Sequence, residues 1–138
     1  FAPWETVKSI LPYINLAFVD MKFFSNDLHK QYTGVDNALI KQNLLATNES
    51  EDKFQLVVRT PIIPGLNDSE QELCKIGEFC TKLKKLSYVQ LLPYHKLGTA
   101  TYEKLGRTYA LPDVKSPTPN QMAGYVKIIE RYVENVIF

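Results

Sequence analysis

The sequence is poor in the residues that mark several common protein classes. Only two cysteines occur among its 138 residues, too few for a disulfide-stapled scaffold, so we expect reduced thiols and a cytoplasmic location. Sixteen Lys and Arg residues are balanced by fifteen Asp and Glu residues, which predicts no basic surface for nucleic acid. No apolar run approaches the roughly 20 residues that cross a membrane, and no signal peptide is visible.

What remains is typical of one ordinary globular domain. The chain is 45% hydrophobic and 22% charged, and its length allows a substantial core. It begins with Phe1 rather than Met, and we interpret residues 1–138 as a segment of a longer polypeptide.

Strand-like and helix-like segments alternate along the chain. Residues 16–22, 54–62 and 88–94 are rich in β-branched and aromatic residues and predict strands. Strands separated by helices pair in parallel through right-handed crossovers. A complete (β/α)₈ barrel takes roughly 250 residues. We therefore predict an α/β fold, a partial (β/α) barrel of three adjacent parallel strands with outer helices. Its outer strands would have open edges through which the chain self-associates.

The helices have recognisable start signals. Ser69 with Glu72 is typical of a capping box, and so is Thr118 with Gln121. We expect Lys82, Lys84 and Lys85 at the end of the helix that Ser69 begins, and an irregular segment over 95–117. The other predicted helices lie near 6–11, 25–32 and 37–46, and the last helix is expected to bury Met122, Tyr125, Val126, Ile129 and Val133.

Charged residues end each of the three predicted strands. Asp20 and Lys22 end the first strand, Arg59 closes the second, and His95 closes the third. The carboxyl ends of barrel strands carry active sites, so we predict that these four side chains converge at one rim. Lys, Arg and His suit a carboxylate or phosphate, and Asp20 suits an ammonium, a hydroxyl or a cation. Local ion pairing at a strand end is the simpler alternative.

The remaining candidate residues have structural interpretations. Cys74 and Cys80 lie six apart on one predicted helix, which turns their side chains away from each other and is not a metal-site spacing. Cys80 falls on the apolar face and is interpreted as a core residue. His29 is interpreted as a helix-surface residue, and the dispersed tyrosines predict no stacking platform for bases.

Four blocks of sequence resemble one protein family. They are VDMK from Val19, TGVDNALIKQNL from Thr33, RTPIIPGLND from Arg59 and LLPYHKLGTATYEKLGRTYAL from Leu91. Together they are similar to the glycyl-radical enzyme activating enzymes, of which the pyruvate formate-lyase activating enzymes are the best-known group. The order and spacing of the blocks fit through nearly the whole chain.

The resemblance implies radical S-adenosylmethionine (SAM) chemistry. The family uses a [4Fe-4S] cluster to cleave SAM into methionine and a 5′-deoxyadenosyl radical, which takes hydrogen from a glycine of the partner enzyme. It implies that Asp20, Lys22, Arg59 and His95 contact SAM or lie near it, with Asp20 also at a monovalent-cation site. A pyruvate formate-lyase-like glycyl-radical enzyme and an electron donor are the implied partners.

The family's C-x-x-x-C-x-x-C cluster loop and its G-G-E segment are absent from this sequence. The chain is therefore interpreted as the C-terminal half of a radical SAM barrel, without the cluster-binding half. We expect neither cluster nor SAM bound to it and no activity from it alone. A non-catalytic half-barrel that binds a partner, and a fragment of a phosphate-binding barrel, are the alternatives.

Overall fold

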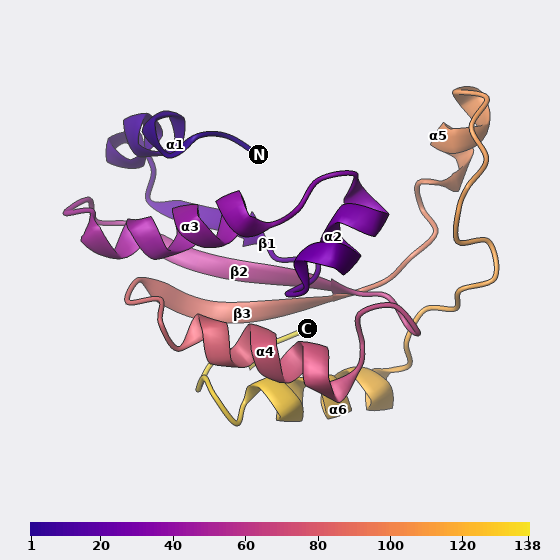
Figure 1. The fold of residues 1–138 in the computed structure, drawn as a ribbon. Helices are drawn as coiled ribbons and strands as arrows, with labels where there is room; N and C mark the ends of the chain where they lie inside the picture. The colour runs from indigo at the N-terminus through magenta and orange to yellow at the C-terminus, as the bar shows by residue number, and fades with distance from the viewer.

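A computed structural model describes residues 1–138, except for the side chains of Thr99 and Ala100. Four parallel strands form one sheet in the order β1-β2-β3-β4 (Figure 1). Their bounds are Leu16–Asp20, Gln55–Ile62, Leu86–Pro93 and Val136–Ile137. The three predicted strands are confirmed as adjacent, parallel and in chain order. The short β4 was not predicted; it pairs Val136 with Val89 and so covers one edge of β3.

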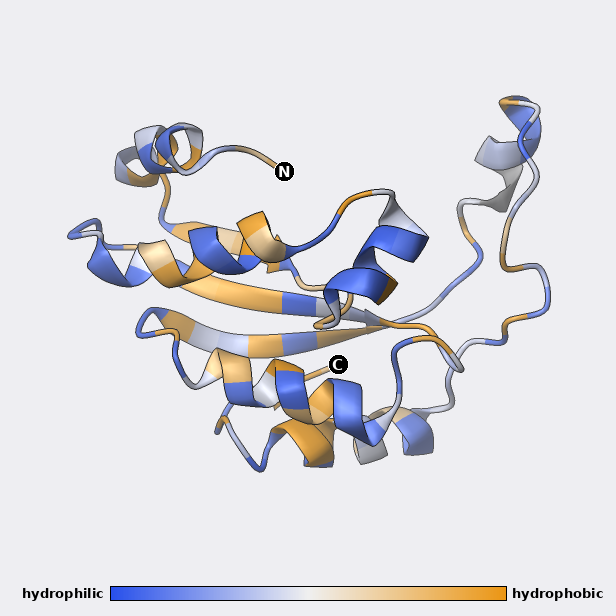
Figure 2. Cartoon of the chain, viewed as in Figure 1, coloured by the Kyte–Doolittle hydropathy of each residue, from blue (hydrophilic) through white to orange (hydrophobic). Residues whose placement is uncertain are grey.

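Helices cover one face of this sheet. In chain order the helices are α1 (Trp4–Ile10), α2 (Asn26–Thr33), α3 (Ala38–Ala46), α4 (Glu70–Cys80), α5 (Thr99–Lys104) and α6 (Pro119–Ile129), with short 3₁₀ turns η1 (Leu11–Tyr13) and η2 (Thr47–Glu49). Of these, α5 extends away from the sheet and does not cover it (Figure 1). Each strand is followed in the chain by its neighbour in the sheet, always in the same direction. Because the crossovers are right-handed, the crossover helices all lie on the same side of the sheet. Both hydrophobic and hydrophilic residues occur along α3 and α4, as amphipathic covering helices require (Figure 2).

One hydrophobic core lies between the helices and this face of the sheet. Alternate strand residues such as Val58, Ile62 and Leu91 pack there with Leu73 and Ile76 of α4. Cys80 is in the same core with 1% of its surface exposed, as predicted. Gly77 of α4 permits close packing, because a Cβ atom there would lie 2.7 Å from Cδ2 of Tyr132.

The other face of the sheet is partly open. Leu16 and Phe18 of β1 and Ile137 of β4 point to it, and each is at least 42% exposed. β1 is also an edge strand, with hydrogen-bonding groups on one side that no described strand pairs. The self-association that we expect through this edge stays a prediction.

Three local predictions need correction. Helix α4 ends at Cys80, so Lys82, Lys84 and Lys85 lie in the turn that follows it. Residues 95–117 are not wholly irregular, because they contain α5, and this segment extends away from the sheet (Figure 1). Val133 lies beyond the end of α6, although it packs against the core as predicted. The first and third corrections concern where a helix ends, which local propensity fixes poorly.

The two capping boxes differ in the structure. Thr118 Oγ1 accepts from Gln121 N, and the Gln121 side chain accepts from Thr118 N, so the second box is complete. At α4, Ser69 Oγ accepts from Glu72 N at 3.3 Å, but the Glu72 carboxylate points elsewhere. The prediction of a full box at Ser69 is therefore wrong. The Glu72 carboxylate instead binds the loop that follows β1.

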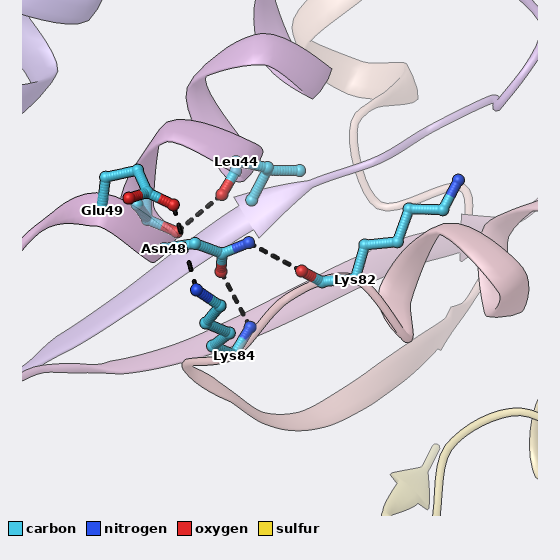
Figure 3. Close-up of polar contacts among 6 residues, drawn as sticks. Leu44, Asn48, Glu49, Lys82 and Lys84 are labelled. Atoms are coloured by element: carbon cyan, nitrogen blue, oxygen red, sulfur yellow. Dashed lines mark hydrogen bonds and ion pairs between the residues drawn. The ribbon is translucent and has the colours of Figure 1, made fainter.

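Polar side chains also hold the amino ends of the strands. Asn48, in η2, donates from Nδ2 to Lys82 O at 2.7 Å and accepts at Oδ1 from Lys84 N at 2.8 Å (Figure 3). Lys84 also lies 3.9 Å from the Glu49 carboxylate, in a pair that is mostly exposed. One amide thus ties the turn after α3 to the turn after α4.

Candidate functional site

The carboxyl end of β1 brings an acidic residue against a basic residue of β2. Arg59 is predicted to end its strand, but it is the fifth of the eight residues of β2, which continues to Ile62. The parallel register places Asp20 opposite Arg59. Arg59 donates to Asp20 Oδ1 from Nε at 3.0 Å and from Nη2 at 2.9 Å, and its guanidinium lies 5.1 Å from the centre of the Phe18 ring. Both side chains are about one-third exposed (35% and 36%), so the pair faces water rather than the core. Asp20 Oδ2 has no partner among the described side chains and can accept from a ligand.

The loop after β1, called the braced loop below, is held by hydrogen bonds from side chains to its backbone carbonyl groups. Thr60 Oγ1 donates to Met21 O at 3.0 Å, and Asn67 Nδ2 donates to Lys22 O at 2.7 Å. Asn37 Nδ2 donates to Phe23 O at 2.5 Å and to Phe24 O at 3.1 Å. Since Asn37, Thr60 and Asn67 are each at most 1% exposed, these bonds are protected from water.

Two charged side chains from helices also form hydrogen bonds with the backbone of this loop. Glu72, 5% exposed, accepts from the backbone N–H groups of Phe24 and Ser25, the latter at 3.0 Å. Lys41 Nζ donates to Phe24 O at 3.0 Å, and burial lowers its pKa although Glu72 and Asp36 raise it. Loop N–H groups that are shielded from water need an acceptor, which explains why Glu72 turns away from its own helix.

Asp20, Lys22 and Arg59 line one open cavity of about 490 Å³. Lys22 is exposed and lies just beyond the end of β1, in the braced loop. His95 does not line this cavity. It is exposed, and its Nδ1 accepts a long hydrogen bond of 3.4 Å from Leu97 N at the base of the segment that extends from the sheet. Three of the four predicted residues are therefore brought together, and the ligand roles of all four stay predictions.

His29 lines the same cavity, and its interpretation as a surface residue is wrong. The side chain is 3% exposed, and Phe23 meets its ring edge-on at 6.5 Å between centroids. The error arose because helix periodicity is weak over one short helix. A usable signal was the spacing of His29 and Thr33, which places both on the same face of α2.

The cysteines do not fit an iron–sulfur cluster. Cys80 lies in the core, where burial raises the pKa of its thiol to about 12, so it is a protonated thiol and not a thiolate ligand. Cys74 lies on the same helix at a spacing that turns it away from Cys80. In the part of the chain that the structure describes, no group of three or more His, Cys, Asp or Glu residues is placed to hold a metal ion. Nor does that part contain a helix long and apolar enough to cross a membrane.

Comparison with known proteins places this geometry in context. No protein-family model matches the chain. Over 130 residues, or 94% of the chain, it is 38% identical to the indoleacetate decarboxylase activating enzyme of Tractidigestivibacter scatoligenes, of which it covers 41%. It is 39% identical over 109 residues, or 79% of the chain, to the 4-hydroxyphenylacetate decarboxylase activating enzyme of Clostridium scatologenes, of which it covers 35%.

The chain is homologous to the glycyl-radical enzyme activating enzymes. A further such relative is the isethionate sulfite-lyase activating enzyme of Nitratidesulfovibrio vulgaris, 39% identical over 83% of the chain and 36% of the relative. The chain thus spans between about a third and two fifths of the length of these activating enzymes.

A solved structure supports the fold. The chain resembles a crystallised domain of the pyruvate-formate lyase-activating enzyme from Bacteroides vulgatus with a TM-score of 0.76, over 97% of this chain and 73% of that one. Because the two are 24% identical, this likeness establishes the shared α/β architecture and nothing about the ligand.

Proposed function

We propose that this chain is part of a radical SAM activating enzyme and contributes one side of its SAM site. The observation that carries the proposal is the Asp20–Arg59 ion pair, which borders a cavity together with Lys22 at the carboxyl end of β1. The identity of 38–39% to activating enzymes of three different specificities supports it.

The charges match the amino-acid end of SAM. Lys22 and Arg59 suit the carboxylate, and Oδ2 of Asp20 suits the α-ammonium group. When bound at a reduced [4Fe-4S] cluster, SAM supplies a 5′-deoxyadenosyl radical for hydrogen abstraction. The residues of this chain orient and neutralise the methionine end. Since neither cysteine fits a cluster, its ligands are proposed to lie outside residues 1–138, and the chain alone is proposed to be inactive.

The proposed partner is a glycyl-radical enzyme. The relatives are named for two decarboxylases and a sulfite-lyase, so the partner is proposed at the level of the enzyme class, with pyruvate formate-lyase-like enzymes included. A cytoplasmic location and an external electron donor complete the proposal.

The test compares the 138-residue chain with a polypeptide that also carries the cluster motif. After anaerobic reconstitution with iron and sulfide, both receive SAM and a chemical reductant, and 5′-deoxyadenosine is quantified. We expect product from the longer protein only, and at least a tenfold lower yield from its Arg59→Ala variant. Absence of product from the reconstituted longer protein would refute the SAM chemistry. Product from the 138-residue chain alone would refute the division of the site. SAM binding that is unchanged by Arg59→Ala would favour the alternative of a non-catalytic binding domain.

A further inference from the structure

His29 is held in the cavity in a single orientation. Its Nδ1 lies 2.7 Å from Val35 O and 2.9 Å from Thr33 Oγ1. A carbonyl oxygen only accepts, so Nδ1 carries the hydrogen in the first of these bonds. The tight return of the chain depends on Gly34, whose φ of +85° ends α2 in the left-handed conformation and brings Val35 O back over the helix. Thr33 Oγ1 donates to His29 O at 2.7 Å, which closes this small network.

These contacts leave one polar atom uncommitted. With the hydrogen on Nδ1, Nε2 of the neutral imidazole is an acceptor. Among the described residues, Nε2 has no hydrogen-bond partner. The residue as a whole is 3% exposed, but Nε2 is not one of the fully buried unpaired side-chain atoms, which are Asn37 Oδ1 and Asn43 Oδ1. His29 is one of the residues that line the cavity with Asp20, Lys22 and Arg59. Nε2 is therefore an unpaired acceptor that a bound molecule or water can reach.

We propose that His29 is a ligand-binding residue of this cavity, whose Nε2 accepts a hydrogen bond from an uncharged donor of the bound nucleoside. The proposal rests on the proposed function. The charged groups of the cavity already match the carboxylate and ammonium ends of an amino acid, so an uncharged acceptor is best used by an uncharged donor. In SAM the uncharged donors are the ribose hydroxyls and the adenine amino group, and both belong to the nucleoside. His29 lies on α2, on the far side of the braced loop from β1, and so contacts a different part of a ligand from Asp20 and Arg59 (Figure 1).

Two substitutions separate the two ring nitrogens. His29→Asn places an amide NH₂ near the position of Nδ1, so the bond to Val35 O is kept while the Nε2 acceptor is lost. His29→Gln reaches the position of Nε2 with an amide oxygen but loses the bond to Val35 O. The unfolding midpoint of each variant reports the structural role, and ligand affinity reports the binding role.

Calorimetric titrations with SAM, 5′-methylthioadenosine and methionine form the test, on the polypeptide that carries the cluster motif. We expect His29→Asn to weaken SAM and 5′-methylthioadenosine roughly three- to tenfold, the loss of about one hydrogen bond, and to leave methionine unchanged. His29→Gln should recover much of the affinity while lowering the unfolding midpoint. In the wild-type protein, the ¹⁵N signal of His29 Nε2 should shift with SAM and with 5′-methylthioadenosine. The only other histidine is His95, so a His95→Asn variant assigns the signals.

The outcomes are distinguishable. Equal affinity of His29→Asn and wild type for SAM overturns the role of His29 while the proposed function stands, provided that Arg59→Ala still loses SAM. A loss confined to methionine overturns the assignment to the nucleoside. If the wild-type protein binds no SAM at all, the proposed function fails and this inference fails with it.

Discussion

The two ends of the sheet use polar side chains for different purposes. At the amino ends of β2 and β3, Asn48 satisfies its donor and its acceptor by joining two turns. At the carboxyl ends, Asn37, Asn67 and Glu72 brace a loop whose neighbours Asp20, Lys22 and His29 line a cavity, and Oδ1 of Asn37 is buried without a partner. The difference shows that side-chain hydrogen bonds at one end stabilise the fold, whereas at the other end they also position groups that the fold does not use.

The largest expected effect is on stability, at the carboxyl end. Glu72→Ala leaves the N–H groups of Phe24 and Ser25 without their acceptor in a shielded loop, so we expect a loss of about 2–4 kcal/mol in the free energy of unfolding. Urea unfolding followed by circular dichroism measures it. The matched control is Glu70→Ala in the same helix turn, where the carboxylate pairs with Arg131 on the surface, and a much smaller change is expected. Equal losses in the two variants would contradict the bracing role.

The second effect should separate binding from stability. Arg59→Lys keeps a positive charge but loses the paired donation from Nε and Nη2 to Asp20. Because this pair is about one-third exposed, we expect about 0.5 kcal/mol or less of lost stability but about a tenfold weaker affinity for SAM. Unfolding and calorimetry on the same preparation test this. A large loss of stability with unchanged affinity would make Arg59 a structural residue and remove the contrast between the two ends.

The third effect belongs to the amino end. Asn48→Ala removes the bonds to Lys82 O and Lys84 N, and we expect about 1 kcal/mol of lost stability with no change in SAM affinity. Asn48→Asp keeps the acceptor for Lys84 N but loses the donor to Lys82 O. Its loss of stability should therefore arise at Lys82 O, which the new carboxylate faces. Weaker SAM binding in Asn48→Ala would show that the two ends are coupled.

The smallest effect concerns alkaline pH and involves neither end directly. Tyr125 of α6 donates to Asp68 Oδ2 at 2.8 Å, and burial, followed by this bond and the charge of Asp68, raises the pKa of its hydroxyl to about 12. A phenol whose pKa is higher in the folded state than in the unfolded state stabilises fully below the unfolded value near 10, and this contribution is lost as pH rises toward 12.

Tyr125→Phe should therefore lose less stability than wild type between pH 9.5 and 11.5 (about the span of the two pKa values), as measured by urea midpoints across that range. Tyr13→Phe, at a tyrosine that is 86% exposed, is the control and should follow wild type. An identical alkaline slope in all three proteins would refute the role of Tyr125.

Local sequence was sufficient for the elements and for part of the site. The alternation of apolar strands and amphipathic helices predicts a parallel sheet, because connections of that length and handedness allow few other arrangements. The sequence predicts Asp20 and Arg59 at one rim of the sheet, but not the ion pair between them. The register aligns Asp20, the last residue of β1, with Arg59, the fifth of the eight residues of β2. The capping pattern at Thr118 acts within one turn and therefore appears as predicted.

Tertiary structure decided what depends on distant partners. Glu72 satisfies its local box pattern in sequence but turns to Phe24 and Ser25, because shielded N–H groups of the loop after β1 need an acceptor more than an exposed helix start does. His29 is buried because Phe23 and Val35 enclose it, and His95 stays outside the cavity because the chain leaves the sheet after β3. Strand β4 is two residues long, too short for a periodic signal, and forms only because β3 offers it an edge. The sequence by itself thus determined the order and direction of the strands and the charge at their ends, through short-range periodicity. Which of those groups face one cavity was decided by packing between segments far apart in the chain.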